Sequence, residues 1–242
     1  MATENHPRFA STPRTRRQML KSSMSLTGAA VLGATAFGSG VLSGCSRSTA
    51  SDVDVNQSPA AALGLHEDAI LVGPLDKPTL TWTDHNSEPY NIAEATAGRT
   101  TLMFFGYTSC PDQCPVYLNN MAAAIDTLEA SARAVNVLFV GVDTARDTPE
   151  VMKNYLESKD RNFLGLTASP AEIDGVLASL ALPSVSFPDG TEGNYTVGHP
   201  LQCVAFTRDN LCHVMYPYDL RQSEWADQLK VLSTIEWPAE ES

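Results

Sequence analysis

The sequence predicts an α/β fold in which a mixed central β-sheet is covered by helices on both faces and the chain ends in a hairpin and a helix. Apolar runs at 101–105 (TLMFF) and 137–142 (VLFVGV) are typical of strands that are buried on both faces. Segments with helical spacing separate these runs, and two further strand-like segments precede the last helix. With 242 residues, 43% of them hydrophobic and 18% charged, the chain is long enough for one well-buried domain with extensions.

The first elements of the domain follow from apolar patterns and turn residues. Residues 79–83 (TLTWT) form a short strand, and the turn-forming residues 86–89 (NSEP) end it. The apolar run at 101–105 is the next strand, which Gly106 closes. A helix is expected at 116–133, because four apolar residues fall on one side of it: Leu118, Met121, Ile125 and Leu128.

The middle of the domain repeats this alternation. The run at 137–142 is a second buried strand, and a helix at 149–158 follows it, with Thr148 as the N-cap and Pro149 at the first helical position. A short strand at 163–166 and a helix at 170–180 complete this part.

An irregular excursion, 183–198, comes next and contains three turn-forming residues in a row, 188–190 (PDG). Residues 201–206 and 211–216 then predict a hairpin around the turn TRDN, and the last helix is expected at 223–235. This order of elements contains no internal repeat.

The N-terminal region is expected to direct export. Residues 15–21 (TRRQMLK) resemble a twin-arginine signal, and an uncharged apolar stretch follows at 22–44. The next residues, LSGC, resemble a lipobox, in which Cys45 is acylated and becomes the new N-terminus. An uncleaved membrane anchor and ordinary signal cleavage are the alternatives. We therefore expect a signal at 1–45, a tether at 46–75 and a domain at 76–238, anchored to the outer face of the cytoplasmic membrane.

The charge of the chain is acidic, with a formal net charge of −12. The first 44 residues carry five basic residues and one acidic residue, so the exported part is more acidic still. An acidic domain without a basic run repels phosphate backbones, which argues against nucleic acid as a partner, whereas metal cations and cationic proteins are attracted.

Two cysteines lie in the segment GYTSCPDQCP, after the strand at 101–105. Pro115 disfavours a helical conformation for Cys114 and fits the first turn of the following helix. We therefore expect Cys114 at or near the N-cap and Cys110 in the loop before it. The unpaired N–H groups of a helix N-terminus stabilise thiolates, which makes both sulfurs nucleophiles and metal ligands.

Three interpretations of this cysteine pair remain open from the residues alone. A structural disulfide would close a very small loop and therefore contribute little stability. A redox couple would resemble the thioredoxin dithiol, but three residues rather than two separate these cysteines. A soft-metal site would use two thiolates, which select Cu(I), zinc or iron–sulfur clusters, and would need a third ligand from elsewhere.

Three segments together resemble the Sco (SenC) copper-chaperone family: 104–115 (FFGYTSCPDQCP), 142–150 (VDTARDTPE) and 198–200 (GHP). The resemblance covers residues 75–237. It implies a thioredoxin-like fold in which Cys110, Cys114 and His199 bind one copper ion, as Cu(I) or Cu(II). The family resemblance further implies delivery of that copper to the binuclear copper site of cytochrome c oxidase subunit II, and no enzymatic turnover.

The sequence departs from the family pattern at three positions. Thr144 replaces the usual proline, Gly198 the usual aspartate and Pro200 the usual serine. Position 198 can therefore give no side-chain support to the metal site, whereas Asp143 is expected to act near it. Pro200 restricts His199 to an extended backbone, which could hold the imidazole in place.

The chain contains a second candidate histidine and two further cysteines. His213 is the rival histidine, but strand alternation places it on the opposite face from its neighbour Cys212. Cys203 and Cys212 are expected to share a face of the hairpin diagonally, too far apart for a disulfide, and to act as core residues or as an extra redox pair. The alternative function is a thiol–disulfide oxidoreductase that reduces the cysteines of the oxidase copper site. A peroxide-scavenging enzyme is a third possibility.

Overall fold

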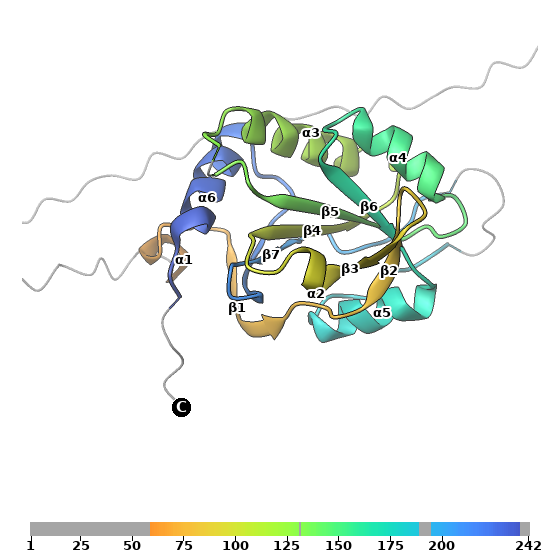
Figure 1. Cartoon of the computed structure of the whole chain (residues 1–242), viewed down its shortest axis with the longest axis horizontal. Coiled ribbons are helices and arrows are strands. Elements are labelled where there is room, and N and C mark those ends of the chain that lie inside the picture. Colours follow the sequence, from red (N-terminus) through yellow and green to blue (C-terminus); the bar gives the residue numbers. More distant parts are fainter. Residues whose placement is uncertain (1–58, 131, 189–194, 238–242) are drawn as a thin grey trace, which may run out of the picture. The chain divides into compact units, whose positions relative to one another are not determined.

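The computed structural model describes residues 59–130, 132–188 and 195–237 (Figure 1). Eight strands form one sheet in the order β1-β8-β7-β4-β5-β6-β2-β3. The β4·β5 and β5·β6 pairs are parallel, and the remaining pairs are antiparallel. The mixed sheet that the sequence predicts is therefore confirmed.

The elements follow one another along the chain as α1 (Pro59–Ala62), β1 (Ile70–Asp76), β2 (Thr81–Asp84), β3 (Pro89–Asn91), α2 (Ile92–Ala95), β4 (Thr101–Gly106), α3 (Gln113–Asp126), β5 (Asn136–Gly141), α4 (Pro149–Glu157), β6 (Phe163–Thr167), α5 (Pro170–Ser179), β7 (Cys203–Phe206), β8 (Leu211–Tyr216) and α6 (Gln222–Thr234). The expected strands and helices are all present, with shifted ends. The sequence analysis missed α1, β1, β3 and α2, which are short or lie at the sheet edges.

Helices cover both faces of the sheet because the central strands are apolar on both sides. In β4, Leu102 and Phe104 point into the core shared with α3, α4 and α6, above the sheet in Figure 1. Met103 and Phe105 point into the second core, which α5 covers from below. Every residue of β4 is buried, as the continuous apolar run predicts.

Helix starts follow the capping signals that the sequence carries. Thr148 caps α4 through its hydroxyl, which accepts from the Val151 N–H, and Pro149 is the first helical residue. The start of α3 differs from the expectation, because the helix begins at Gln113 and places Cys114 inside its first turn. Pro115 fits there as well, since the N–H groups of the first turn have no partner within the helix.

The expected tether is wrong for residues 59–75. These residues form α1 and β1, and β1 pairs with β8 in antiparallel fashion from Ile70 to Asp76. Leu65, between α1 and β1, is buried in the core. The sequence pattern did not reveal this edge strand, because Gly73 and Pro74 interrupt its apolar residues, and the register irregularity between Leu71 and Leu75 falls at this interruption.

The hairpin of β7 and β8 also differs from the expectation. A register irregularity between Ala205 and Phe206 places Cys212 opposite Phe206. Cys203 therefore lies in the core beneath α3 and α6, whereas Cys212 lies in the core on the α5 side. The two thiols are both free and buried, on opposite faces of the sheet rather than on one.

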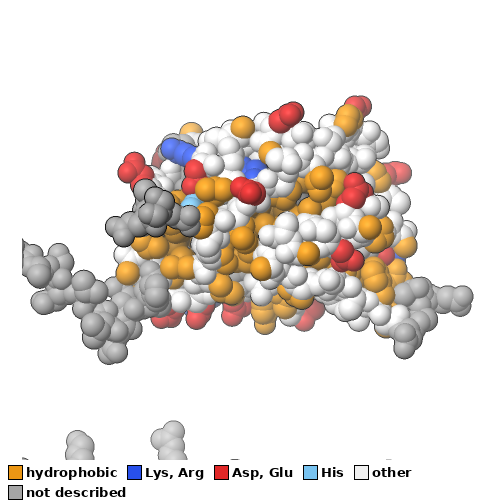
Figure 2. All heavy atoms as spheres, turned by 90° about the horizontal axis from the view of Figure 1, so that it is seen from below, with side chains coloured by type: hydrophobic (Ala, Val, Ile, Leu, Met, Phe, Trp, Pro, Cys, Tyr) orange, Lys and Arg blue, Asp and Glu red, His pale blue; other side chains and the backbone are white. Residues whose placement is uncertain are grey.

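The surface on the α5 side is shown in Figure 2. Aspartate and glutamate side chains are scattered around hydrophobic ones on this face, and lysine and arginine appear in few places. The exposed hydrophobic residues of the chain include Ile70, Leu71 and Leu80. Within the described ranges, none of the helices has both the length and the apolar character needed to cross a membrane.

Deletion of β1 tests its assignment to the domain. A chain that begins at residue 77 loses the β1·β8 pairing and the buried Leu65, whereas a chain that begins at residue 59 keeps both. We expect the shorter chain to have a free energy of unfolding lower by at least about 2 kcal/mol, which is the scale of one buried leucine. Urea unfolding followed by circular dichroism measures the difference, and equal midpoints would contradict the assignment.

Candidate metal centre

The cysteine loop begins where β4 ends. Gly106 is the last residue of β4, and a β-carbon at this position would lie 3.0 Å from Cys114 Sγ and 2.8 Å from the ring of Phe104. Glycine is therefore required for the first turn of α3 to approach the strand so closely. The loop then turns back, with the Cys110 N–H donating to the Tyr107 carbonyl oxygen at 3.1 Å.

Asp147 lies in the loop that follows β5, and its carboxylate holds Thr108 of the cysteine loop. One carboxylate oxygen accepts from both the backbone N–H and the hydroxyl of Thr108, at 2.9 and 2.6 Å. The other oxygen accepts from the Asp143 N–H at 3.2 Å. Burial raises the pKa of Asp147, while the two bonds from Thr108 oppose that rise. Asp147 lies in the segment 142–150 (VDTARDTPE), which is the signal in the sequence that points to it.

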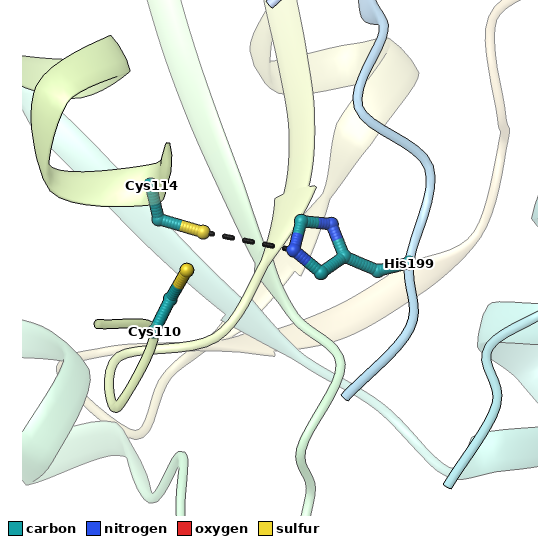
Figure 3. A group of neighbouring side chains, drawn as sticks. All are labelled: Cys110, Cys114 and His199. Carbon is teal, nitrogen blue, oxygen red and sulfur yellow. Dashed lines mark hydrogen bonds between the residues drawn. The ribbon is translucent and has the colours of Figure 1, made fainter. Parts of the chain in front are cut away.

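His199 comes from the end of the excursion after α5 and meets the two cysteines (Figure 3). The sulfur atoms of Cys110 and Cys114 and a ring nitrogen of His199 lie within 4.8 Å of one another. Cys114 Sγ is 3.8 Å from His199 Nε2. The structure therefore brings together the three residues that the sequence analysis assigned to a metal.

The second ring nitrogen of His199 fixes the tautomer. Nδ1 lies 2.8 Å from the Pro200 carbonyl oxygen, which can only accept a hydrogen bond, so Nδ1 carries the proton. In the neutral imidazole, Nε2 then offers its lone pair toward the sulfurs, as a metal ligand requires. Phe104 and Tyr107 meet the imidazole edge to face, with ring centroids 6.1 and 5.6 Å away, and so hold its plane.

The pKa values of the two cysteines are shifted in opposite directions. The hydrogen bond with Cys114 lowers the pKa of Cys110 to about 4, helped by the N–H groups of residues 112–114. The same hydrogen bond and burial raise the pKa of Cys114 well above its usual value. Cys110, which is half-buried, is therefore the thiolate, and the fully buried Cys114 is the proton donor.

Asp143 does not contact the three candidate ligands directly. It is 1% exposed, and its carboxylate binds Arg146 and accepts the Tyr195 hydroxyl at 2.9 Å. The expectation that Asp143 acts near the site stands only in this indirect sense. Its residue type gave no hint of these partners, because Tyr195 is 52 positions away in the sequence.

His213 lies away from the cysteines. Its Nε2 is 2.8 Å from Asp209 Oδ2, and its ring stacks on Trp237 with centroids 4.4 Å apart. These contacts give the rival histidine a structural role at the hairpin turn. It therefore serves as a matched control for His199.

The site opens to solvent through a hollow of about 320 Å³. Residues from both segments line it, among them Tyr107, Cys110, Gln113, Val197 and His199. The opening places the half-buried Cys110 within reach of a partner protein.

A sheet covered on both faces, with a dithiol loop running from its central strand into a helix, defines a thioredoxin-like protein with a candidate soft-metal site. The chain belongs to the SCO1/SenC family, whose model matches residues 77–234. One relative, SCO2-like protein RP587 of Rickettsia prowazekii, is 31% identical over 142 residues, or 58% of this chain and 66% of that protein. The chain thus spans less than two thirds of the length of this curated relative.

Solved structures agree with the family assignment. Bradyrhizobium japonicum ScoI with copper bound matches with a TM-score of 0.56 and 33% identity, over 67% of this chain and 99% of that chain. BsSco, a member of the Sco family of cytochrome c oxidase assembly proteins with a disulfide switch, matches with a TM-score of 0.52 over 68% of this chain and 98% of its own. At 21% identity, BsSco supports the fold alone. The predicted thioredoxin-like fold is confirmed.

The lowered pKa of Cys110 predicts that its alkylation rate depends little on pH. Because Cys110 is already a thiolate above its pKa of about 4, we expect its rate with iodoacetamide to change by less than about twofold between pH 6 and pH 8. An ordinary thiol would react roughly tenfold faster per pH unit over this range. Mass spectrometry of the reduced protein measures the rate, and Cys110→Ser should remove the fast phase. A steep rise with pH would refute the assignment of the thiolate.

Proposed function

We propose that this protein binds copper through Cys110, Cys114 and His199 and passes it to a partner. The observation that carries the proposal is the approach of two sulfurs and an imidazole nitrogen to within 4.8 Å of one another. The copper-bound structure of a 33% identical relative supports the choice of metal. Copper is here the cargo rather than a resident cofactor.

The donor set suits copper in both oxidation states. Two soft thiolates favour Cu(I), and imidazole accommodates Cu(I) and Cu(II). Binding must displace the proton of Cys114, so copper loading releases a proton and weakens as the pH falls. A three-ligand site at an open hollow leaves room for an incoming ligand of the receiving protein, which lets the metal move without being released into water.

We propose further that the receiving protein is subunit II of cytochrome c oxidase, at its binuclear copper site. Membership of the SCO1/SenC family supports this, and BsSco is described as belonging to a family of cytochrome c oxidase assembly proteins. In this role the protein is a metallochaperone, not an enzyme with turnover. Its acidic surface is suited to attracting cations and cationic partners.

A second function is favoured by the thiolate of Cys110. A thiol with a pKa of about 4 beside a buried protonated thiol is the arrangement that a thiol–disulfide oxidoreductase uses. In that case the protein would reduce the cysteines of the oxidase copper site. Disulfide exchange needs no imidazole ligand, so His199 separates the two functions.

Substitution of the ligands tests copper binding. We expect Cys110→Ser or Cys114→Ser to remove most of the Cu(I) affinity of the reduced protein, because each deletes a thiolate. His199→Ala should lower it by at least about tenfold, or roughly 1.4 kcal/mol, and should alter the Cu(II)–thiolate absorption band. Competition with a chromophoric chelator measures the affinity. His213→Ala is the matched control and should change neither quantity.

Oxidation and cell-based assembly decide between the two functions. A disulfide offers no thiolate, so the oxidised protein should bind Cu(I) far more weakly than the reduced protein. Cells that carry His199→Ala should make an oxidase that lacks copper in subunit II. If that oxidase were fully loaded while the cysteine variants failed, copper delivery would be wrong and the reductase function would stand.

We also propose that the protein is exported and anchored at the outer face of the cytoplasmic membrane by acylation of Cys45. Residues 1–58 lie outside the described residues, so this proposal is supported by the signal-like and lipobox-like segments alone. We expect Cys45→Ser to release the protein from the membrane fraction or to block its processing. Intact-mass analysis that found an unmodified mature N-terminus elsewhere would end this proposal.

A further inference from the structure

Arg146 connects the loop after β5 to the segment that carries His199. Its Nε donates to Oδ2 of Asp143, and its Nη2 donates to the backbone carbonyl oxygen of Tyr195 at 3.2 Å. The Tyr195 hydroxyl donates to the other oxygen of Asp143 at 2.9 Å. The three residues thus form a closed set of hydrogen bonds, which we call the clamp, and it joins two segments that are far apart in the sequence.

The clamp also reaches the imidazole through aromatic rings. The guanidinium carbon of Arg146 lies 3.7 Å from the ring centroid of Tyr195 and 5.7 Å from that of Tyr107. Tyr107 in turn meets the His199 ring edge to face at 5.6 Å. These are cation–π and aromatic contacts of ordinary geometry. A continuous row of contacts therefore runs from Arg146 through Tyr107 to His199.

Burial makes the clamp rigid. Asp143 is 1% exposed, while the side chain of Arg146 is 25% exposed. A buried carboxylate is costly unless it is paired and hydrogen-bonded, so both oxygens of Asp143 hold their partners in one arrangement. Arg146 donates to Asp143 and to Tyr195 through two different nitrogens, and its guanidinium carbon lies 3.7 Å from the centroid of the tyrosine ring, so a lysine could not reproduce its contacts.

The other support for His199 is backbone pairing. The N–H and carbonyl oxygen of Gly198 pair with those of Ser186, both at 2.9 Å. A β-carbon at position 198 would lie 2.3 Å from Ser186 Oγ, so this bridge is packed without a side chain at Gly198. Gly198 therefore gives the segment no side-chain support. Tyr195, the clamp residue four positions before His199, can provide it.

We propose that Arg146, Asp143 and Tyr195 are positioning residues, which hold the segment 195–199 so that His199 Nε2 faces the two sulfurs before copper arrives. This inference rests on the proposed function, since it assigns the residues that preorganise the same site. Without the clamp, the pairing of Gly198 with Ser186 would be left to hold the segment, so more of its ordering would occur when copper binds, and that cost would reduce the affinity.

Conservative substitutions test the clamp without leaving a buried charge unpaired. Tyr195→Phe removes only the hydroxyl that binds Asp143, and Arg146→Lys keeps the positive charge but loses the flat guanidinium. Each is made in the full chain and again together with His199→Ala, and Tyr90→Phe on β3 is the matched control. Two quantities are measured on the reduced protein: the Cu(I) affinity, and the hydrogen-exchange rate of the Gly198 amide in the copper-free protein.

We expect Tyr195→Phe and Arg146→Lys each to lower the Cu(I) affinity by about three- to tenfold when His199 is present, which is the scale of one typical hydrogen bond in a folded protein. In the His199→Ala background the same changes should cost less than about twofold, because a clamp that acts through His199 has nothing left to position. Exchange of the Gly198 amide should become at least about fivefold faster. Tyr90→Phe should change neither quantity.

The outcomes separate the clamp from mere structural damage and from the proposed function. Equal losses of affinity in both backgrounds would show that the substitutions disturb the whole domain, and would overturn the positioning role. Unchanged affinity and unchanged exchange would overturn it as well. If the unsubstituted protein bound no copper, the proposed function would fail, and the exchange rate of Gly198 alone would then decide whether the clamp holds the segment.

Discussion

The antiparallel pairing of β4 with β7 is the constraint on which the metal centre depends. Phe104, near the end of β4, lies opposite Cys203, the first residue of β7. Because the strands run in opposite directions, the end of β4 that leads into the cysteine loop meets the start of β7, which His199 precedes by four residues. Two segments 85 residues apart thus reach one point, where Cys114 contacts His199.

The parallel pairing of β4 with β5 supplies the other wall of the site. Gly106 lies opposite Gly141, and the pairing continues into the loops, where the Val142 N–H donates to the Gly106 carbonyl oxygen at 2.8 Å. The carboxyl ends of parallel strands lie at one edge of a sheet, so the loop after β5 is brought beside the cysteine loop. Asp147 can then hold Thr108, while Asp143 and Arg146 hold Tyr195. Two neighbouring aspartates of one loop therefore serve the two halves of the site.

The electrostatics of the site follow from burial. Cys114 is enclosed by the first turn of α3, whereas Cys110 keeps contact with solvent and with the N–H groups that begin the helix. One hydrogen bond between the sulfurs therefore moves their pKa values in opposite directions. A thiolate in this arrangement suits both a soft metal and disulfide exchange. The imidazole of His199, rather than the pair of cysteines, therefore distinguishes the two proposed functions.

The sequence by itself determined the order of the elements from β4 to α6, the capped start of α4 at Thr148, and the three candidate ligands. Apolar runs, caps and short motifs are local, and local features can be read from neighbouring residues. The sequence did not reveal β1, because Gly73 and Pro74 interrupt its apolar residues, and only the pairing with β8 shows that both parts belong to one strand. It misplaced Cys203 relative to Cys212, because one irregularity in the register exchanges the faces of a strand. The distant partners of the two aspartates, Tyr195 for Asp143 and Thr108 for Asp147, were decided by tertiary structure alone, since they lie far from the carboxylates in the sequence.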